Sequence, residues 1–73
     1  MAALTPTPRY NRVISSAAKI ADDMGHDHLG VEHLFLAIIR ERNSLPGQIL
    51  GEEVDLAGLD QRIIEQMAAT YTQ

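Results

Sequence analysis

The sequence predicts an all-α protein, a compact bundle of four helices of which one is short. Along most of its 73 residues, apolar side chains recur at steps of three and four, the period of one helix face. The apolar fraction is 45%, yet the chain has only one phenylalanine, two tyrosines and no tryptophan. A core of aliphatic side chains suits packed helices better than a sheet. Strand patterns are absent from the sequence.

The first helix is expected to follow a flexible lead-in of residues 1–6. Thr7 is a good N-cap, and Pro8 suits the first helical position, where its missing N–H costs nothing. Gly25 supplies the left-handed residue that commonly closes a helix. Between these ends, one amphipathic face is formed by Tyr10, Val13, Ile14, Ala17, Ile20, Ala21 and Met24.

The second helix is expected to start near Gly30 or Val31 and to end at Asn43. Glu32 falls in its first turn, where a carboxylate favours the positive end of the helix dipole. Residues 34–39 are apolar on every side, which predicts a central helix covered by its neighbours.

Two more helices complete the predicted domain of residues 7–73. Ser44 can cap a short helix over residues 45–50 that closes near Gly51, and Asp55 can cap the fourth helix. The core face of that last helix is expected to contain Leu56, Leu59, Ile63, Met67 and Thr70 or Tyr71.

Composition excludes several classes of function. The chain has no cysteine, so it has neither a disulfide nor a thiolate metal site. A net charge of −4 argues against a nucleic-acid partner. No apolar run approaches the roughly 20 residues that a membrane span needs, and no signal pattern begins the chain. We therefore expect a cytoplasmic protein with no membrane partner.

The most informative stretch joins the first two predicted helices and reads Gly25-His26-Asp27-His28-Leu29-Gly30-Val31-Glu32-His33-Leu34. It resembles the Gly-His-x-x-Ile-Gly-Thr-Glu-His-Leu signature of the Clp N-terminal repeat, the substrate- and adaptor-docking module of Clp-family AAA+ unfoldases. The likeness covers residues 7–64. It implies the four helices of one such repeat, here in a single-repeat, stand-alone form, with no enzymatic activity and no cofactor.

The chain departs from the family pattern in ways that bear on function. Family members usually carry two repeats followed by ATPase domains, whereas this chain has one repeat and no Gly-x-x-x-x-Gly-Lys-Ser/Thr phosphate loop. Pro6 stands where the family has an aromatic residue, Pro8 where it has an acidic one, and Val31 where it has threonine. Ligand contacts made through these three positions are the ones affected.

The resemblance also implies a candidate ligand. In some family members the glutamate of the signature helps to hold phosphorylated arginine, a tag that marks proteins for degradation. Glu32 could pair with the guanidinium, and Thr7 could add a hydroxyl. The alternative is purely structural, with Glu32 a partner of the helix dipole and Thr7 a cap.

Histidines allow a metal interpretation of the same segment. His26, His28, Glu32 and His33 are all of a type that binds zinc, and a zinc titration with a His28→Ala control would test them. However, Glu32 and His33 are adjacent and would point about 100° apart on a helix. We therefore predict no metal ligands. We also predict no catalytic residues, since four short helices offer little room for a pocket and an oriented partner.

A lone repeat lacks the sister repeat that normally packs against it, and a symmetric dimer can restore that contact. We therefore expect a homodimer, with Tyr10, Met67 and Tyr71 as candidates for the partner surface; each can equally cap the monomer core. The favoured function is a non-enzymatic protein-binding module of Clp-type quality control. It would dock a substrate segment, degradation tag or adaptor, or modulate a Clp unfoldase. The alternatives are a helical dimerisation domain that has lost its ligand and a small metal-binding protein.

Overall fold

The computed structural model of the chain describes residues 3–71, and these residues contain no strand. The helices are α1 (Pro8–Asp23), α2 (Val31–Arg40), α3 (Leu45–Glu53) and α4 (Leu56–Thr70). The predicted all-α class and the four helices are therefore confirmed.

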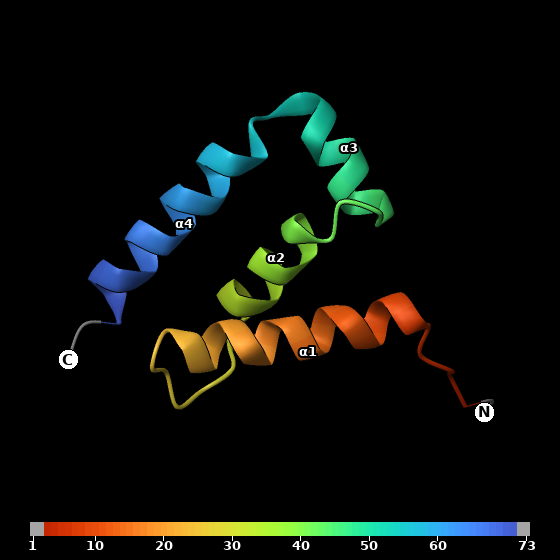
Figure 1. The fold of residues 1–73 in the computed structure, drawn as a ribbon, viewed down its shortest axis with the longest axis horizontal. Coiled ribbons are helices and arrows are strands. Elements are labelled where there is room, and N and C mark those ends of the chain that lie inside the picture. The colour runs from red at the N-terminus through yellow and green to blue at the C-terminus, as the bar shows by residue number, and fades with distance from the viewer. Residues whose placement is uncertain (1–2, 72–73) are drawn as a thin grey trace.

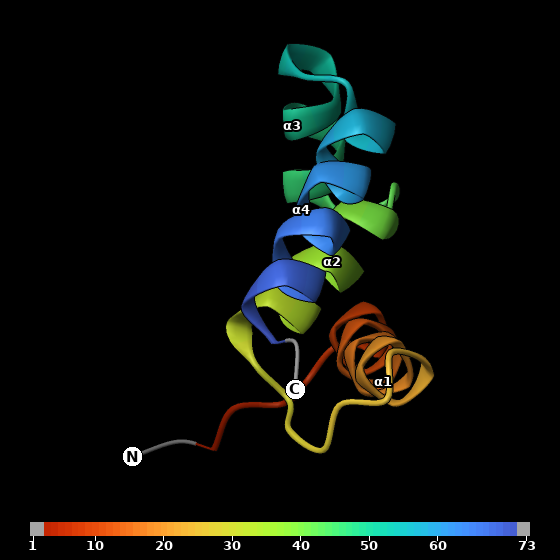
Figure 2. The same ribbon diagram turned by 90° about the vertical axis from the view of Figure 1, so that its left-hand side faces the viewer.

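α2 is the central element of the fold. It packs against α1 on one side and against both α3 and α4 on the other. Figure 1 shows α3 and α4 as the two arms of an arch above α2, with α1 crossing below. In Figure 2 the view runs almost along α1, and α2, α3 and α4 stand in one upright layer. The molecule is correspondingly flat, with extents of 42 × 31 × 20 Å.

The core forms where α1 and α4 pack against α2. Leu36, Ala37 and Ile39 supply the central residues, and each is at most 1% exposed. The predicted apolar face of α1 and the predicted core positions of α4 meet them. The buried cluster consists of Val13, Ala17, Ile20, Leu36, Ala37, Ile39, Leu56 and Met67.

Several helix ends follow the predicted chemistry. The Thr7 hydroxyl accepts the backbone N–H of Tyr10 at 3.1 Å, which caps α1. Gly25 has a φ of +75° just after α1 and turns the chain away from it. The Ser44 hydroxyl accepts the N–H of Gly47 at 3.1 Å and caps α3.

Two predicted helix ends are wrong in detail, since α2 ends at Arg40 and not at Asn43. α3 does not close at Gly51 but continues to Glu53. Gly51 lies inside the helix, where a β-carbon would stand 3.3 Å from the Leu56 side chain of α4. Asp55 does precede α4 as predicted, yet its carboxylate makes no capping hydrogen bond.

The outer face of α2 is also more open than its sequence suggests. Apolar residues on every side of residues 34–39 predicted a helix covered all round, but Phe35 is 39% exposed, and Val31, which precedes that run, is 75% exposed. They stand one turn apart on the side that faces away from the buried Leu36 and Ala37. No helix within residues 3–71 is long and apolar enough to cross a membrane.

Candidate functional site

Two regions at opposite ends of α2 collect the polar side chains of interest. At the first turn of α2, His33 is fully buried, and its Nδ1 accepts the backbone N–H of Gly30 at 2.8 Å. That N–H belongs to the residue before the helix and would otherwise lack a partner. Burial lowers the pKa of His33, and the nearby His26 lowers it further. His33 is therefore a neutral imidazole that closes the start of α2.

We call His26, His28 and His33 the histidine cluster. Because the Nδ1 of His33 is an acceptor, its proton lies on Nε2, which donates to Nδ1 of His26 at 2.8 Å. The ring of His28 stacks on that of His26 with centroids 5.2 Å apart. The ring of Tyr71 closes the group, with its centroid 4.9 Å from that of His28. The histidine cluster and Tyr71 thus join the loop before α2 to the end of α4.

The histidine cluster has the spacing of a metal site but not its proton arrangement. One nitrogen from each of the three rings lies within 4.8 Å of the other two. However, a metal on Nε2 of His33 would require the ring proton to sit on Nδ1. There it would face the Gly30 N–H, so that two hydrogen-bond donors would oppose each other. The lone pair of His26 Nδ1 is likewise engaged by His33. This geometry supports the prediction of no metal ligands, which stays a prediction.

Glu32 lies beside the cluster on the outer side of α2. Its Oε1 accepts the Tyr71 hydroxyl at 2.5 Å. This hydrogen bond lowers the pKa of Glu32, helped by the backbone N–H of the same residue, and it raises the pKa of Tyr71. Both residues line a shallow hollow of about 260 Å³ with Ile63, Gln66, Met67 and Thr70. The carboxylate is thus an ionised acceptor with one oxygen already engaged.

The second region is an open groove at the other end of α2, between the start of α1 and the start of α3. We call it the α1–α3 groove. Its volume is about 520 Å³, and its lining is mostly apolar, with two arginines and no acidic residue. The lining residues are Thr7, Pro8, Arg9, Tyr10, Arg12, Val13, Ile38, Ser44, Leu45 and Pro46.

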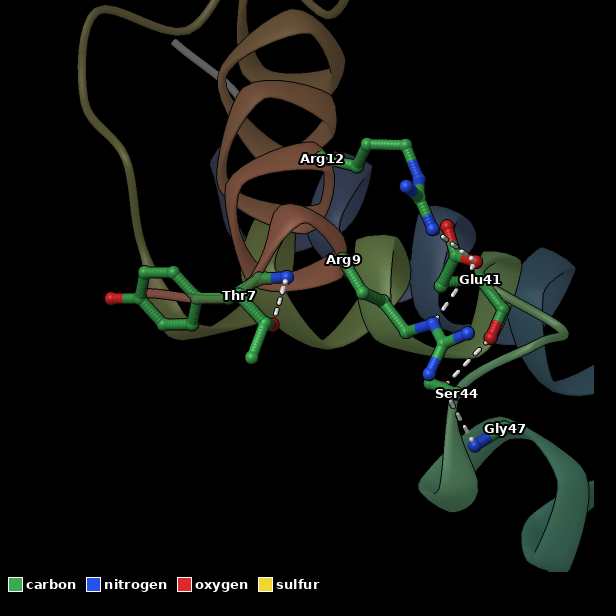
Figure 3. A network of polar contacts seen from close by, with 7 residues as sticks. Thr7, Arg9, Arg12, Glu41, Ser44 and Gly47 are labelled. Atoms are coloured by element: carbon green, nitrogen blue, oxygen red, sulfur yellow. Dashed lines mark hydrogen bonds and ion pairs between the residues drawn. The ribbon is translucent and has the colours of Figure 1, made fainter. Parts of the chain in front are cut away.

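Two arginines converge beside the groove on one carboxylate. In Figure 3, Arg9 and Arg12 reach from the first turns of α1 towards Glu41, the C-cap residue of α2. Arg12 lies 3.5 Å from the Glu41 carboxylate and Arg9 lies 3.9 Å from it. The side chain of Arg9 is 50% exposed and that of Arg12 is 56% exposed, whereas that of Glu41 is 18% exposed.

The corner between α2 and α3 holds Glu41 in place. The Ser44 hydroxyl donates to the Glu41 carbonyl at 2.7 Å and accepts the Gly47 N–H, as Figure 3 shows. Gly47 allows this close approach, because a β-carbon there would lie 2.5 Å from the Glu41 carbonyl oxygen. A glycine that weakens a helix by composition is required here by packing.

The structure separates the two residues predicted to share a ligand. Thr7 lines the α1–α3 groove and a neighbouring hollow, whereas Glu32 lines the hollow beside Tyr71, and the two regions share no lining residue. Of the predicted partner-surface residues, Tyr10 is 56% exposed and lines the groove, but Met67 is only 3% exposed. Met67 is therefore a core residue of the monomer, the alternative left open for it.

The arginine pair and the capping role of His33 were not among the predictions from the sequence. A polar residue three positions after a helix N-cap is a recognisable capping signal, so His33 was within reach. Arg9 and Arg12 were three residues apart on the predicted first helix, hence on one side of it. Their meeting with Glu41 joins positions 29 and 32 residues apart in the chain and needed the tertiary fold.

Comparison with known proteins agrees with the four-helix fold and the residue 25–34 motif. The family model of the Clp repeat (R) N-terminal domain matches residues 1–53. The chain belongs to this family. Clp N-terminal domains are protein-interaction modules of Clp unfoldases, and the expected family is thereby confirmed.

Similar proteins are much longer than this chain. An ATP-dependent Clp protease ATP-binding subunit ClpA homolog of Guillardia theta is 32% identical over 65 residues, 88% of this chain and 8% of that protein. The negative regulator of genetic competence ClpC/MecB of Bacillus subtilis is 30% identical over 67 residues, 90% of this chain and 8% of that protein. The ClpA homolog of Porphyra purpurea is 29% identical over 62 residues, 84% of this chain and 8% of its own length. No solved structure gives a significant match.

Proposed function

We propose that this Clp N-terminal domain is a non-enzymatic docking module of Clp-type protein quality control. It holds a segment of a substrate, a degradation tag or an adaptor in the α1–α3 groove, or modulates a Clp unfoldase through it. The observation that carries the proposal is the groove itself, about 520 Å³ of mostly apolar surface open to solvent. Within it, Tyr10 is 56% exposed and Leu45 is 66% exposed. Exposed apolar patches of this kind are typical of interaction sites.

The chemistry of the chain supports binding over catalysis. The histidine cluster is engaged in closing the start of α2, where His33 is buried and hydrogen-bonded on both nitrogens. A general base needs access to a substrate proton, and the lone pair of His33 Nδ1 is taken by Gly30. We place this role in the cytoplasm, as expected from the sequence.

An amide-resolved NMR titration with an unfolded model protein, reduced and carboxymethylated lactalbumin, tests the proposal. Saturable shifts are expected at residues 7–13 and 44–46, and Leu45→Asp should abolish them. Ile49→Asp is the matched control, because Ile49 lies on the same helix, is 53% exposed and is not among the groove residues. Absence of saturable shifts in the natural chain, or equal loss in both variants, would refute docking in the groove.

Phosphoarginine is a second candidate ligand, at the other end of α2. Glu32 presents a carboxylate of lowered pKa on the first turn of the helix, which suits a guanidinium. The Tyr71 hydroxyl occupies one of its oxygens, so a bidentate ligand must displace it. Phosphoarginine should then shift residues 30–33, Glu32→Ala should remove the shifts, and Tyr71→Phe should strengthen binding. Because Thr7 lies in a different region, we expect its signal to stay unchanged.

A homodimer is the candidate suggested by the outer face of α2. Val31 is 75% exposed and Phe35 is 39% exposed, and a second copy would cover both. Sedimentation at micromolar concentration should show a dimer that Phe35→Asp dissociates. A strict monomer would remove this role and leave the docking module.

A further inference from the structure

The charge of the α1–α3 groove points to the chemistry of its ligand. The chain as a whole carries a net charge of −4, yet the groove lining contains two arginines and no acidic residue. Among residues 3–71, the carboxylate that both arginines reach is that of Glu41, which balances only one of the two positive charges. The groove is therefore a positive site on an acidic protein.

The two arginines retain unused hydrogen-bonding capacity. The ion pair of Arg40 and Asp60 in the same chain shows the distances of a complete bidentate contact. Arg40 donates to Asp60 through Nε at 2.6 Å and through a terminal nitrogen at 2.9 Å. Arg12 and Arg9 stand 3.5 and 3.9 Å from Glu41, beyond the usual range of a charge-assisted hydrogen bond. Each guanidinium has five N–H donors. A second carboxylate can therefore bind both while Glu41 stays where it is.

The apolar part of the groove indicates which residues the ligand carries beside that carboxylate. Tyr10 and Leu45 both line the groove, and both are more than half exposed. Covering them requires apolar side chains on either side of the charged group. Past Tyr10, the groove adjoins a second hollow of about 450 Å³, lined by residues 4–7 and Tyr10 itself. A ligand chain can thus continue along the surface and need not end in the groove.

From these three observations we infer that the α1–α3 groove recognises an internal, apolar protein segment that carries an aspartate or glutamate side chain. The carboxylate bridges Arg9 and Arg12, and the flanking apolar residues cover Tyr10 and Leu45. This inference rests on the proposed docking function and adds the ligand class to it.

Three synthetic peptides test the inference, all leucine- and isoleucine-rich and dye-labelled for fluorescence anisotropy. All three are acetylated at the N-terminus. The first has one central glutamate and an amidated C-terminus, the second has glutamine in place of the glutamate, and the third is the glutamine peptide with a free C-terminal carboxylate. The natural chain should bind the glutamate peptide about fivefold more tightly than the glutamine peptide, as for a partly exposed ion pair. The preference should shrink as salt is raised.

Matched variants connect the preference to the arginines. Arg12→Gln should bring the two amidated peptides to equal affinity without removing binding. Arg62→Gln on α4 removes the same charge from an exposed residue outside the groove, and the preference should survive it. Unchanged urea midpoints in both variants would show that folding is not the cause.

Each remaining outcome decides a separate point. Equal affinity for the glutamate and glutamine peptides in the natural chain would overturn carboxylate recognition and leave the docking function standing. Tighter binding of the free-ended peptide alone would assign the arginines to a chain terminus and overturn the internal segment. If no peptide binds and a dimer dissociates on Leu45→Asp, the groove is occupied by a second copy and the inference fails. If the natural chain binds none of the peptides and also shows no saturable shifts with lactalbumin, the proposed docking function itself is overturned.

Discussion

The two ends of α2 use polar residues in opposite ways. At the start of the helix, His33 is buried with both ring nitrogens hydrogen-bonded, and Glu32 is joined to Tyr71. At the end of the helix, Arg9 and Arg12 share one carboxylate at long distances and stay half exposed. A satisfied network stabilises the fold, whereas unused donors on a surface are available to a ligand. We call the start of α2, with His33 and Glu32, the closed end, and the end of α2, with Arg9, Arg12 and Glu41, the open end. Mutations at the closed end should therefore lower the stability of the fold, and mutations at the open end should weaken ligand binding.

The largest effect is expected from His33→Ala. It leaves the Gly30 N–H without its acceptor, removes the partner of His26 and empties a fully buried position. We expect a loss of about 2–3 kcal/mol in the free energy of unfolding, measured by urea denaturation. His28→Ala should cost less than about 0.5 kcal/mol, because the His28 side chain is exposed. Similar losses in both variants would show that the hydrogen bond from Gly30 does not make His33 more important for stability than His28.

A smaller loss is expected where α2 joins α3. Ser44→Ala removes both the cap of α3 and the bond to the Glu41 carbonyl, and it should cost about 1 kcal/mol. Asp55→Ala is the matched control, since Asp55 occupies the same position before α4 but makes no capping hydrogen bond. The control should change the urea midpoint little. An equal loss would mean that position alone, without the hydrogen bond, stabilises these helices.

Acid should weaken the closed end. The pKa of His33 is lowered in the folded state, chiefly by burial, so the unfolded chain binds more protons as the pH falls below the ordinary value of 6.5. The stability contribution is complete above that pH and is lost progressively as the pH falls towards the lowered pKa. Protonation also removes the acceptor that the Gly30 N–H uses. His26, His28 and Glu32 surround this ring and set its charge environment.

Urea midpoints between about pH 7.5 and about pH 5 measure this dependence. The natural chain should lose stability over that range more steeply than His33→Gln, which cannot take up a proton. A parallel decline in the two proteins would assign the acid sensitivity to other groups.

The smallest effect on stability is expected at the open end. Arg12→Gln should change the free energy of unfolding by less than about 0.5 kcal/mol, because the guanidinium is 56% exposed and its carboxylate partner is 3.5 Å away. The same variant should remove the preference for a glutamate peptide. A large loss of stability would place Arg12 among the structural residues and erase the difference between the two ends.

Much of the fold was readable from local chemistry. Thr7 and Ser44 cap their helices and Gly25 turns the chain as predicted, because these effects depend on neighbours within a few residues. The errors arose where distant segments meet. Gly51 lies inside α3 close to the Leu56 side chain of the next helix, and within residues 3–71 Val31 and Phe35 stay exposed on the outer side of α2.

The sequence by itself determined the all-α class, the helix starts and the family, since periodicity, caps and the residue 25–34 motif are local in the chain. Only the tertiary structure decided which polar residues are structural and which are free to bind. It placed His33 against Gly30 and His26, set Thr7 and Glu32 in separate regions, and brought Arg9 and Arg12 beside Glu41. Whether a charged or polar group is satisfied depends on burial and on partners that approach from elsewhere in the chain, and no local pattern contains that information.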